Sequence, residues 1–276
     1  MISTAKHFLY NHAYYRNPQG ENMFIQTVIK YITNKNKNII IIDGGFNNGV
    51  WSNNILKYAT PEHIIAYELS NQTYNKNKLN INTKKINLKH CGLYNENKVI
   101  KLKNTYCNDQ GYNIDNNIDN NGFDVKLVIL DDELINYYDK KFIVKIDIEG
   151  AEFKAITGMQ KILNNKQLLI LQWEIHNEHK KIIPSLKTFV DYLSSFGYFI
   201  FILGHENLLR IDSQYYNKYY DITDENLDID IVRGYNFQDN LKIKIGRPEC
   251  INCIAITQEV YNNIKNNNII KIIELE

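Results

Sequence analysis

The sequence predicts an α/β protein built on a doubly wound, mostly parallel β-sheet. Short runs of β-branched and other apolar residues alternate along the chain with segments of helical periodicity. Strands covered by helices on both faces have this composition, and the alternation of the two patterns is typical of a doubly wound sheet. The chain has 276 residues, which is enough for one large core or two smaller ones.

The composition excludes several classes of protein. Hydrophobic residues make up 44% of the chain and charged residues 23%, which excludes a disordered chain, a collagen or a coiled-coil rod. The formal net charge is +1, so no overall field attracts nucleic acid or an anionic membrane. No apolar run approaches the roughly 20 residues that span a bilayer, and the first residues lack a signal peptide. Four cysteines agree with a reducing compartment, so we expect free thiols in a cytoplasmic protein.

The first half of the chain shows the alternation most clearly. A helix is predicted over 22–33, inside an N-terminal helical extension of residues 1–37, because its apolar residues recur at helical spacing. The domain that follows would span 38–276. Its first elements are a strand at NIIIIDGG, a helix over 50–58, a strand over 63–68, a helix over 73–80 and a weaker strand over 87–91.

The alternation breaks between 94 and 130, where two strand-like runs flank a stretch rich in Asn, Asp and Gly. We predict a hairpin insertion there. The sheet then resumes with a strand over 142–147, a helix over 151–163, a strand over 167–174, a helix over 185–196 and a strand over 198–203. Residues 204–249 form a long, Tyr-rich connection that we expect to cover the substrate. The last strand, over 250–257, is expected to be antiparallel and to be followed by a polar tail.

A glycine-rich turn follows the first strand. Asp43 stands at the tip of the strand, and Gly44, Gly45 and Gly49 permit a tight turn before the helix. Ligands of open parallel sheets bind beyond the carboxyl ends of the strands. Glu68 ends the next strand about 20 residues later, where an acid can accept both hydroxyls of a ribose. The pair predicts a site for a nucleoside cofactor.

The turn differs from the G-x-G-x-x-G pattern of dinucleotide sites, since it reads D-G-G-x-N-x-G. Asp43 would repel a phosphate but suits the positively charged amino-acid end of S-adenosylmethionine. This favours a methyltransferase over a dehydrogenase. The alternative is that the glycines only make a sharp turn.

Carboxylates gather after the strand over 142–147. If the chain stays extended, Asp147 and Glu149 lie on one face, and Glu152 falls in the first turn of the next helix, where it is more typical of a helix start than of a catalyst. The following strand ends with Glu174 and His176, again two residues apart. A histidine there could act as a general base on a hydroxyl, although it could equally be structural.

Together these motifs resemble those of the FkbM-type methyltransferases, roughly from Asn38 to Leu203. The D-x-G-x-N-x-G turn is matched by Asp43, Gly45, Asn47 and Gly49, the aromatic-Glu-Pro strand end by Tyr67, Glu68 and Leu69, and the Leu-Asp pair by Leu130 and Asp131. The central K-x-D-x-E-G-x-E segment and its following glycine are matched by Lys145, Asp147, Glu149, Gly150, Glu152 and Gly158, and the E-x-H pair by Glu174 and His176. Phe46, Asn48 and Leu69 depart from the family pattern.

The resemblance implies a Rossmann-like methyltransferase sheet and an S-adenosylmethionine-dependent O-methyltransferase acting on a hydroxyl of a small molecule, such as a sugar or glycan. The residues implied to bind the cofactor are Asp43, Gly44, Gly45, Asn47, Gly49, Glu68, Leu69, Cys91 and Gly92. The residues implied in catalysis are His176, Asp147, Glu149 and Glu174, with His176 favoured as the base. A divalent metal is compatible with this cluster but is not required.

Two other functions are compatible with the sequence. An RNA-modifying methyltransferase is one, because the Lys-rich segment 76–90 could follow a phosphate backbone, although the near-neutral overall charge argues against it. A binding protein that has lost turnover is the other, and the acids and the histidine at the strand ends argue against it. Cys250 and Cys253 have the spacing of zinc ligands, but in a strand an odd spacing points them to opposite faces, so we expect no metal there.

Overall fold

The computed structural model describes residues 18–102, 122–176, 184–204, 206–212 and 250–274. The chain forms two compact units, one of residues 32–171 and one of residues 1–31 together with 172–276. Strand β8 (Leu168–His176) carries the chain from the first to the second. Most of the predicted substrate cover, residues 213–249, lies outside the described residues. Its role, like the predicted domain boundary at residue 38, stays a prediction.

The unit of residues 32–171 contains the predicted parallel sheet. Its strands are β1 (Ile39–Gly44), β2 (His63–Glu68), β3 (Ile86–His90) and β7 (Lys141–Ile146), and β8 follows β7 in the strand order β8-β7-β1-β2-β3. β1 pairs in parallel with β2 and β7, and β2 pairs in parallel with β3. The four isoleucines of β1 are fully buried, as a strand covered on both faces must be. The predicted doubly wound arrangement is confirmed.

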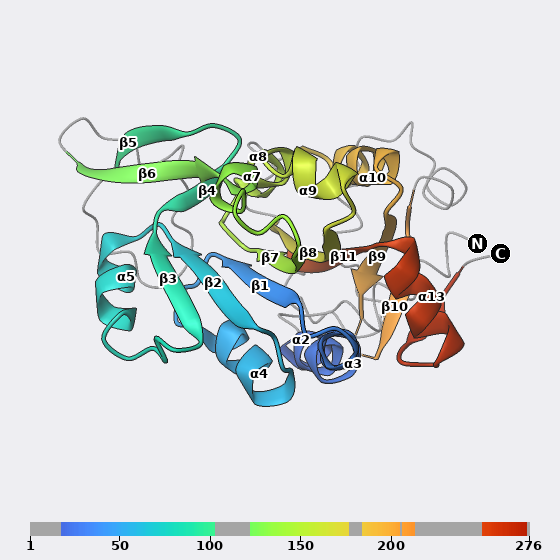
Figure 1. Ribbon diagram of the computed structural model, residues 1–276. Helices are drawn as coiled ribbons and strands as arrows, with labels where there is room; N and C mark the ends of the chain where they lie inside the picture. Colours follow the sequence, from blue (N-terminus) through green and yellow to red (C-terminus); the bar gives the residue numbers. More distant parts are fainter. Residues whose placement is uncertain (1–17, 103–121, 177–183, 205, 213–249, 275–276) are drawn as a thin grey trace, which may run out of the picture. The chain divides into compact units, whose positions relative to one another are not determined.

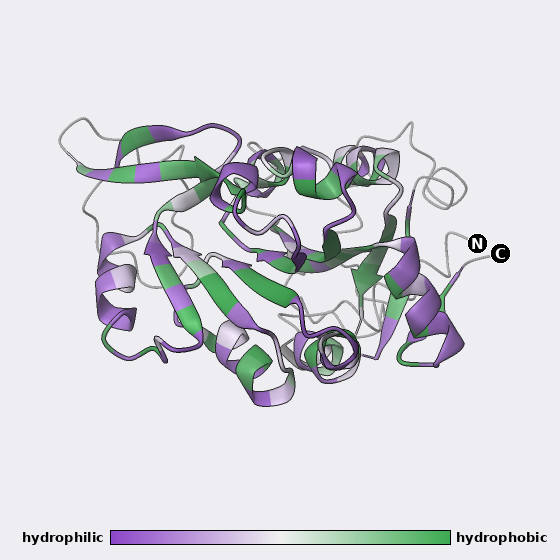
Figure 2. Ribbon diagram, in the orientation of Figure 1, coloured by the Kyte–Doolittle hydropathy of each residue, from purple (hydrophilic) through white to green (hydrophobic). Residues whose placement is uncertain are grey.

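Helices cover both faces of this sheet. Figure 1 shows α4 (Val50–Tyr58) on one side and α7 (Leu130–Glu133), α8 (Glu152–Thr157) and α9 (Gln160–Asn164) on the other. Helix α5 (Asn71–Asn77) begins two residues before the predicted start because the Ser70 hydroxyl accepts a hydrogen bond from the Thr73 N–H at 3.3 Å and caps the helix. Figure 2 shows β1 and β2 as largely hydrophobic and α5 as largely hydrophilic, in keeping with their burial.

The hairpin insertion is also confirmed. β5 (Lys98–Leu102) pairs antiparallel with β6 (Phe123–Ile129). A third strand, β4 (Gly92–Tyr94), pairs in parallel with β6 and was not predicted. Three residues that begin with glycine give too short a pattern for a strand to be recognised from the sequence.

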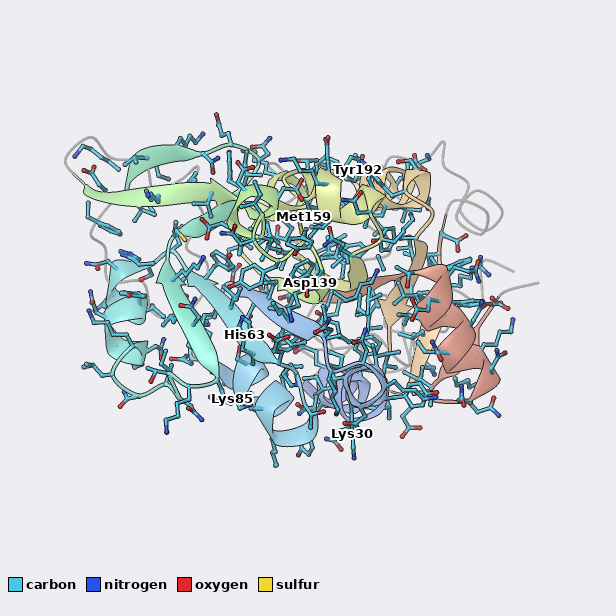
Figure 3. All side chains as sticks on the ribbon, viewed as in Figure 1. Lys30, His63, Lys85, Asp139, Met159 and Tyr192 are labelled. Atoms are coloured by element: carbon cyan, nitrogen blue, oxygen red, sulfur yellow. The ribbon has the colours of Figure 1, made fainter. Side chains whose placement is uncertain are left out.

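The predicted single helix over 151–163 is wrong, because the structure divides it into α8 and α9 at Gly158 and Met159. The Gly158 carbonyl accepts a hydrogen bond from the Asp131 N–H at 3.2 Å. The Asp131 carboxylate accepts bonds from the N–H groups of Lys161 at 2.7 Å and Ile162 at 3.1 Å, and so caps α9. Met159, labelled in Figure 3, is fully buried at this break.

A helical segment begins in the second unit and ends inside the unit of residues 32–171. α2 (Pro18–Phe24), the π-helical turn η1 (Ile25–Ile29) and α3 (Lys30–Lys35) follow one another without a gap. The predicted helix over 22–33 is therefore present and longer at both ends. Nowhere in the described parts of the chain is a helix long and apolar enough to cross a membrane.

The strands of the second unit follow the order β12-β10-β9-β11-β8. β9 (Phe199–Leu203) pairs antiparallel with β10 (Asn207–Arg210) and with β11 (Cys250–Ile256), which confirms the antiparallel strand predicted over 250–257. Two predictions are corrected here. The segment 204–249 includes a strand, β10, and the polar tail folds into α13 (Gln258–Asn266) and β12 (Lys271–Ile273), which pairs in parallel with β10.

A charged network holds this C-terminal segment. Arg210 is 9% exposed, and its guanidinium donates to Asp212 at 2.5 Å and to Glu274 at 2.8 Å. Tyr261 and Lys265 on α13 also bond to Glu274. Burial alone would raise the pKa of Glu274, but these hydrogen bonds lower it to about 2. In the sequence, polar residues that make such bonds cannot be told from those of a solvated tail. This is why α13 and β12 were not predicted.

Candidate functional site

The carboxyl ends of β1, β2, β3 and β7 lie side by side at one edge of the parallel sheet. The residues predicted to bind a cofactor lie at or just beyond the ends of the first three of these strands, and Asp147 and Glu149 follow the fourth. Parallel pairing in register brings these segments together. The structure thus places them at the edge where such sheets bind ligands.

The glycine turn after β1 depends on left-handed backbone. Gly45 has φ 90°, Asn47 φ 47° and Gly49 φ 69°. The N–H groups of Gly45 and Phe46 both donate to the Tyr67 carbonyl at 3.0 Å, which fixes the turn to β2. A Cβ at Gly45 would lie 1.8 Å from the Asp147 carbonyl oxygen. Only glycine fits there, because no side chain can occupy that space.

Gly49 is needed for a different reason. A Cβ at this position would lie 2.4 Å from Cζ of Phe46. The Phe46 ring is only 4% exposed, so this departure from the family pattern is packed inside the turn. Helix α4 begins at Val50 with no side-chain cap, and the N–H groups of the first turn of a helix have no partner within it. The turn therefore ends in backbone donors suited to an anionic ligand group.

Asp43 lies inside the protein at the end of β1. It is 1% exposed, and one carboxylate oxygen accepts a hydrogen bond from the Ser52 hydroxyl at 2.5 Å. The contact fastens α4 to the strand that carries the turn. A direct contact between Asp43 and a cofactor, as the sequence predicts, stays a prediction.

Glu68 connects the ends of two strands. It is 8% exposed, and its two carboxylate oxygens accept hydrogen bonds from the N–H groups of Asn47 at 2.8 Å and Ser70 at 2.7 Å. Burial raises the pKa of Glu68, and these backbone bonds oppose the shift. Each oxygen keeps capacity for a further bond. Glu68 is thus held in place beside the glycine turn with acceptors left for a ligand hydroxyl.

The wall beyond Glu68 is apolar. A Cβ at Gly92 would lie 2.8 Å from Leu69 and 2.9 Å from Leu127, so the bare backbone of Gly92 packs on both side chains. Burial raises the pKa of Cys91 to about 11, which keeps its thiol neutral. Sequence reasoning missed one feature of this wall, the stack of His90 on Tyr74 with ring centroids 4.8 Å apart. His90 is the last residue of the lysine-rich segment 76–90, and nothing in that pattern indicates such a stack.

The segment after β7 is shaped differently from the prediction. β7 ends at Ile146, and Glu149 has φ 57°, so the chain is not extended and the shared face of Asp147 and Glu149 is wrong. The Asp147 N–H donates to the Gly44 carbonyl at 2.9 Å. Its carboxylate accepts a bond from the Lys145 ammonium at 2.7 Å. Lys145 is 6% exposed, and this pairing explains how an acid can close an apolar strand.

The other two predicted catalytic residues belong to the second unit. Glu174 is half-buried in β8, and His176 is the last residue of that strand. The side chain of His176 lies outside the described residues. Among the described residues, no three His, Cys, Asp or Glu side chains are grouped as a metal ion would require. Cys91 and Cys253 are free thiols, and burial raises the pKa of Cys253.

One family model matches more than half of the chain. The model of the methyltransferase FkbM domain matches residues 43–200. Among solved structures, a methyltransferase FkbM from Methylobacillus flagellatus is 15% identical with a TM-score of 0.39, and the match covers 59% of this chain and 39% of that one. A precorrin-6y C5,15-methyltransferase from Geobacter metallireducens is 9% identical with a TM-score of 0.42, and 86% of each chain is covered.

The plantazolicin methyltransferase BpumL, solved with a triazolic desmethylPZN analog and SAH, is 14% identical with a TM-score of 0.38, and the match covers 88% of this chain and 86% of that one. No curated protein matches the sequence. This chain spans 39% of the length of the Methylobacillus protein.

Proposed function

The chain belongs to the FkbM methyltransferase domain family, and we propose that it transfers a methyl group from S-adenosylmethionine to a hydroxyl of a small molecule, namely a sugar or glycan. When bound, the cofactor supplies an electrophilic sulfonium methyl group. The observation that carries the proposal is the pairing of a left-handed glycine turn with a buried acid, Glu68, at one edge of the sheet.

The described residues fit this cofactor. The uncapped start of α4 offers N–H groups to a carboxylate, and Glu68 offers acceptors to ribose hydroxyls. The apolar wall of Leu69 and Gly92 suits the face of an adenine ring. A pyrophosphate fits less well, because Asp43 and Glu68 both stand beside the turn.

Transfer to a hydroxyl also needs a group that removes its proton. We assign this role to His176, since a neutral imidazole accepts protons near pH 7. Asp147 already accepts a bond from the Lys145 ammonium, and an ion-paired carboxylate is a weaker base. We assign Asp147, Glu149 and Glu174 to orienting the substrate or the cofactor. The acceptor class rests on the family resemblance and on the ability of carboxylates to accept hydrogen bonds from sugar hydroxyls.

One observation favours RNA as a second candidate acceptor. Lys76, Lys78, Lys84 and Lys85 are exposed, and no Asp or Glu occurs between residues 69 and 95. None of the four forms an ion pair within the described parts of the chain. Lys76 lies beside the cofactor turn, with its ammonium 3.5 Å from the Asn48 side-chain oxygen. Such a strip could hold phosphates.

An acceptor screen separates the two candidates. The full chain is incubated with methyl-labelled S-adenosylmethionine and either a panel of mono- and oligosaccharides or total RNA, each with and without a chelator. We expect label on a saccharide hydroxyl and none on RNA. Label on RNA alone, lost when Lys84 and Lys85 are both changed to alanine, would replace the sugar proposal with the RNA one. Loss of transfer on chelation would add a metal to the mechanism.

A further inference from the structure

A buried acid to which no catalytic or binding role has been assigned follows the loop after β7. Glu152, at the start of α8, is 3% exposed. Its carboxylate accepts a hydrogen bond from the Ile148 N–H at 3.0 Å and a bifurcated one from the Gly150 N–H, which lies 3.0 and 2.9 Å from the two carboxylate oxygens. All of these donors belong to the loop that precedes the helix. The side chain therefore reaches back and closes the loop of residues 147–150 on itself.

This loop adopts a conformation that needs an anchor. Glu149 has φ 57° and Gly150 has φ 104°, and a non-glycine residue in the left-handed region has an energetic cost. Hydrogen bonds from the residues on either side of Glu149 to a single carboxylate offset that cost. They do so without solvent competition, because Glu152 is buried.

The same loop forms one side of the cofactor turn. The Asp147 N–H bonds to the Gly44 carbonyl at 2.9 Å, and the Asp147 carbonyl occupies the space that a Cβ of Gly45 would need. A shift of the loop would therefore move the backbone on which the turn rests. The same shift would move the carboxylate of Asp147, because Asp147 directly precedes Ile148, whose N–H is bonded to Glu152.

We propose that Glu152 is a positioning residue for the methyl-transfer site, which holds the loop of residues 147–150 so that the loop supports the cofactor turn at Gly45. The inference rests on the proposed function, because it assigns the turn to S-adenosylmethionine. It predicts that loss of the Glu152 carboxylate weakens cofactor binding without any direct contact between the two.

The charge state of Glu152 supports this role. Burial raises its pKa to about 7, the backbone bonds from Gly150, Glu152 and Ile148 oppose the shift, and the nearby charge of Asp147 adds to it. The Lys145 ammonium pairs with the Asp147 carboxylate at 2.7 Å. The ionised carboxylate accepts all the loop N–H bonds, whereas a proton on one oxygen would oppose the Gly150 N–H. The loop should therefore loosen as the pH falls through about 7.

Two measurements on the full chain test the proposal. Amide hydrogen exchange, which needs no ligand, should show faster exchange at Ile148 and Gly150 in Glu152→Gln than in the wild type. Calorimetry with S-adenosylhomocysteine should show affinity about tenfold weaker, as expected when hydrogen bonds to a charged group are lost. Wild-type affinity should also fall between pH 8 and pH 6, and this pH dependence should be absent in Glu152→Gln.

Asp131→Asn is the matched control. Asp131 is also buried, at 8% exposure, and also accepts two backbone N–H bonds, from Lys161 and Ile162, but it does not bond to the loop. This variant should speed exchange at Lys161 and Ile162 and leave the affinity unchanged. Faster exchange at Ile148 and Gly150 in Glu152→Gln with unchanged affinity would overturn the positioning role, as would unchanged exchange.

Two further outcomes are possible: the variant does not fold, or the wild type does not bind the cofactor product. If Glu152→Gln does not fold, Glu152→Asp takes its place, and unchanged exchange at Ile148 and Gly150 or unchanged affinity in that variant overturns the proposal. If the wild type binds no S-adenosylhomocysteine, the proposed function fails, and with it the positioning role, whereas the exchange data still report on the loop anchor.

Discussion

Changing Gly45 to alanine should abolish binding of S-adenosylhomocysteine and destabilise the unit of residues 32–171. The new Cβ would lie 1.8 Å from the Asp147 carbonyl oxygen, and the residue has φ 90°, which L-residues rarely adopt. Overlap with backbone cannot be relieved by a side-chain rotation. Strain at such a position costs up to about 3 kcal/mol and the overlap adds to it, so the turn or the Asp147 loop must move.

The measurement is thermal unfolding together with calorimetry, and Gly197→Ala is the control. Gly197 also has a left-handed backbone, with φ 74°, but it follows α10 (Leu186–Ser195) in the second unit. This control should lower stability by about 1 kcal/mol and leave cofactor binding intact. If Gly45→Ala matches the wild type in both stability and affinity, the turn does not have the described geometry.

Changing His176 to alanine should lower turnover by about 100-fold or more, the usual effect of removing a general base. Affinity for S-adenosylhomocysteine should not change, because the role assigned to His176 concerns the acceptor hydroxyl. The experiment uses the acceptor found in the screen and measures initial rates at saturating cofactor. Asp147→Asn should behave differently, since it leaves the Lys145 ammonium buried without its ion pair and should lower stability as well as turnover.

His63→Ala serves as the control for His176→Ala. His63 begins β2 and so lies at the amino-terminal edge of the sheet, opposite the candidate site. Its loss should not affect turnover. Full turnover of His176→Ala would remove this residue from the mechanism and leave a carboxylate as the base.

The sequence was sufficient to predict most of the parallel sheet, because its central strands are continuous apolar runs bounded by turn residues. The bounds predicted for β2 and α4 agree with the structure residue for residue. Elements formed by polar residues could not be predicted in this way. In α13, the buried residues Val260 and Tyr261 are separated from Ile264 by asparagines, which obscures the helical pattern. β12 is held partly by a bond from Arg210 to Glu274, which no local sequence pattern indicates.

The sequence predicted where in the fold the candidate site residues lie, but not the conformation of the loop after β7. Glycines, Asp43 and Glu68 stand at the expected strand ends, since register alone puts them there. The arrangement after β7 could not be predicted, because the left-handed turn at Glu149 depends on hydrogen bonds to Glu152, four residues from Ile148. The prediction that Glu152 is an acid at the start of a helix gives its place correctly. It does not include the hydrogen bonds that its carboxylate accepts from Ile148 and Gly150.

Calorimetric titration of the wild-type chain with S-adenosylhomocysteine and, separately, with NAD tests the central claim most directly. The glycine turn, the uncapped start of α4 and Glu68 predict that S-adenosylhomocysteine binds and NAD does not. Affinity should fall by about tenfold to 100-fold in Glu68→Gln, because hydrogen bonds to a charged acceptor are worth about 1.5–3 kcal/mol. Binding of NAD without binding of S-adenosylhomocysteine would contradict the account and indicate a dinucleotide site.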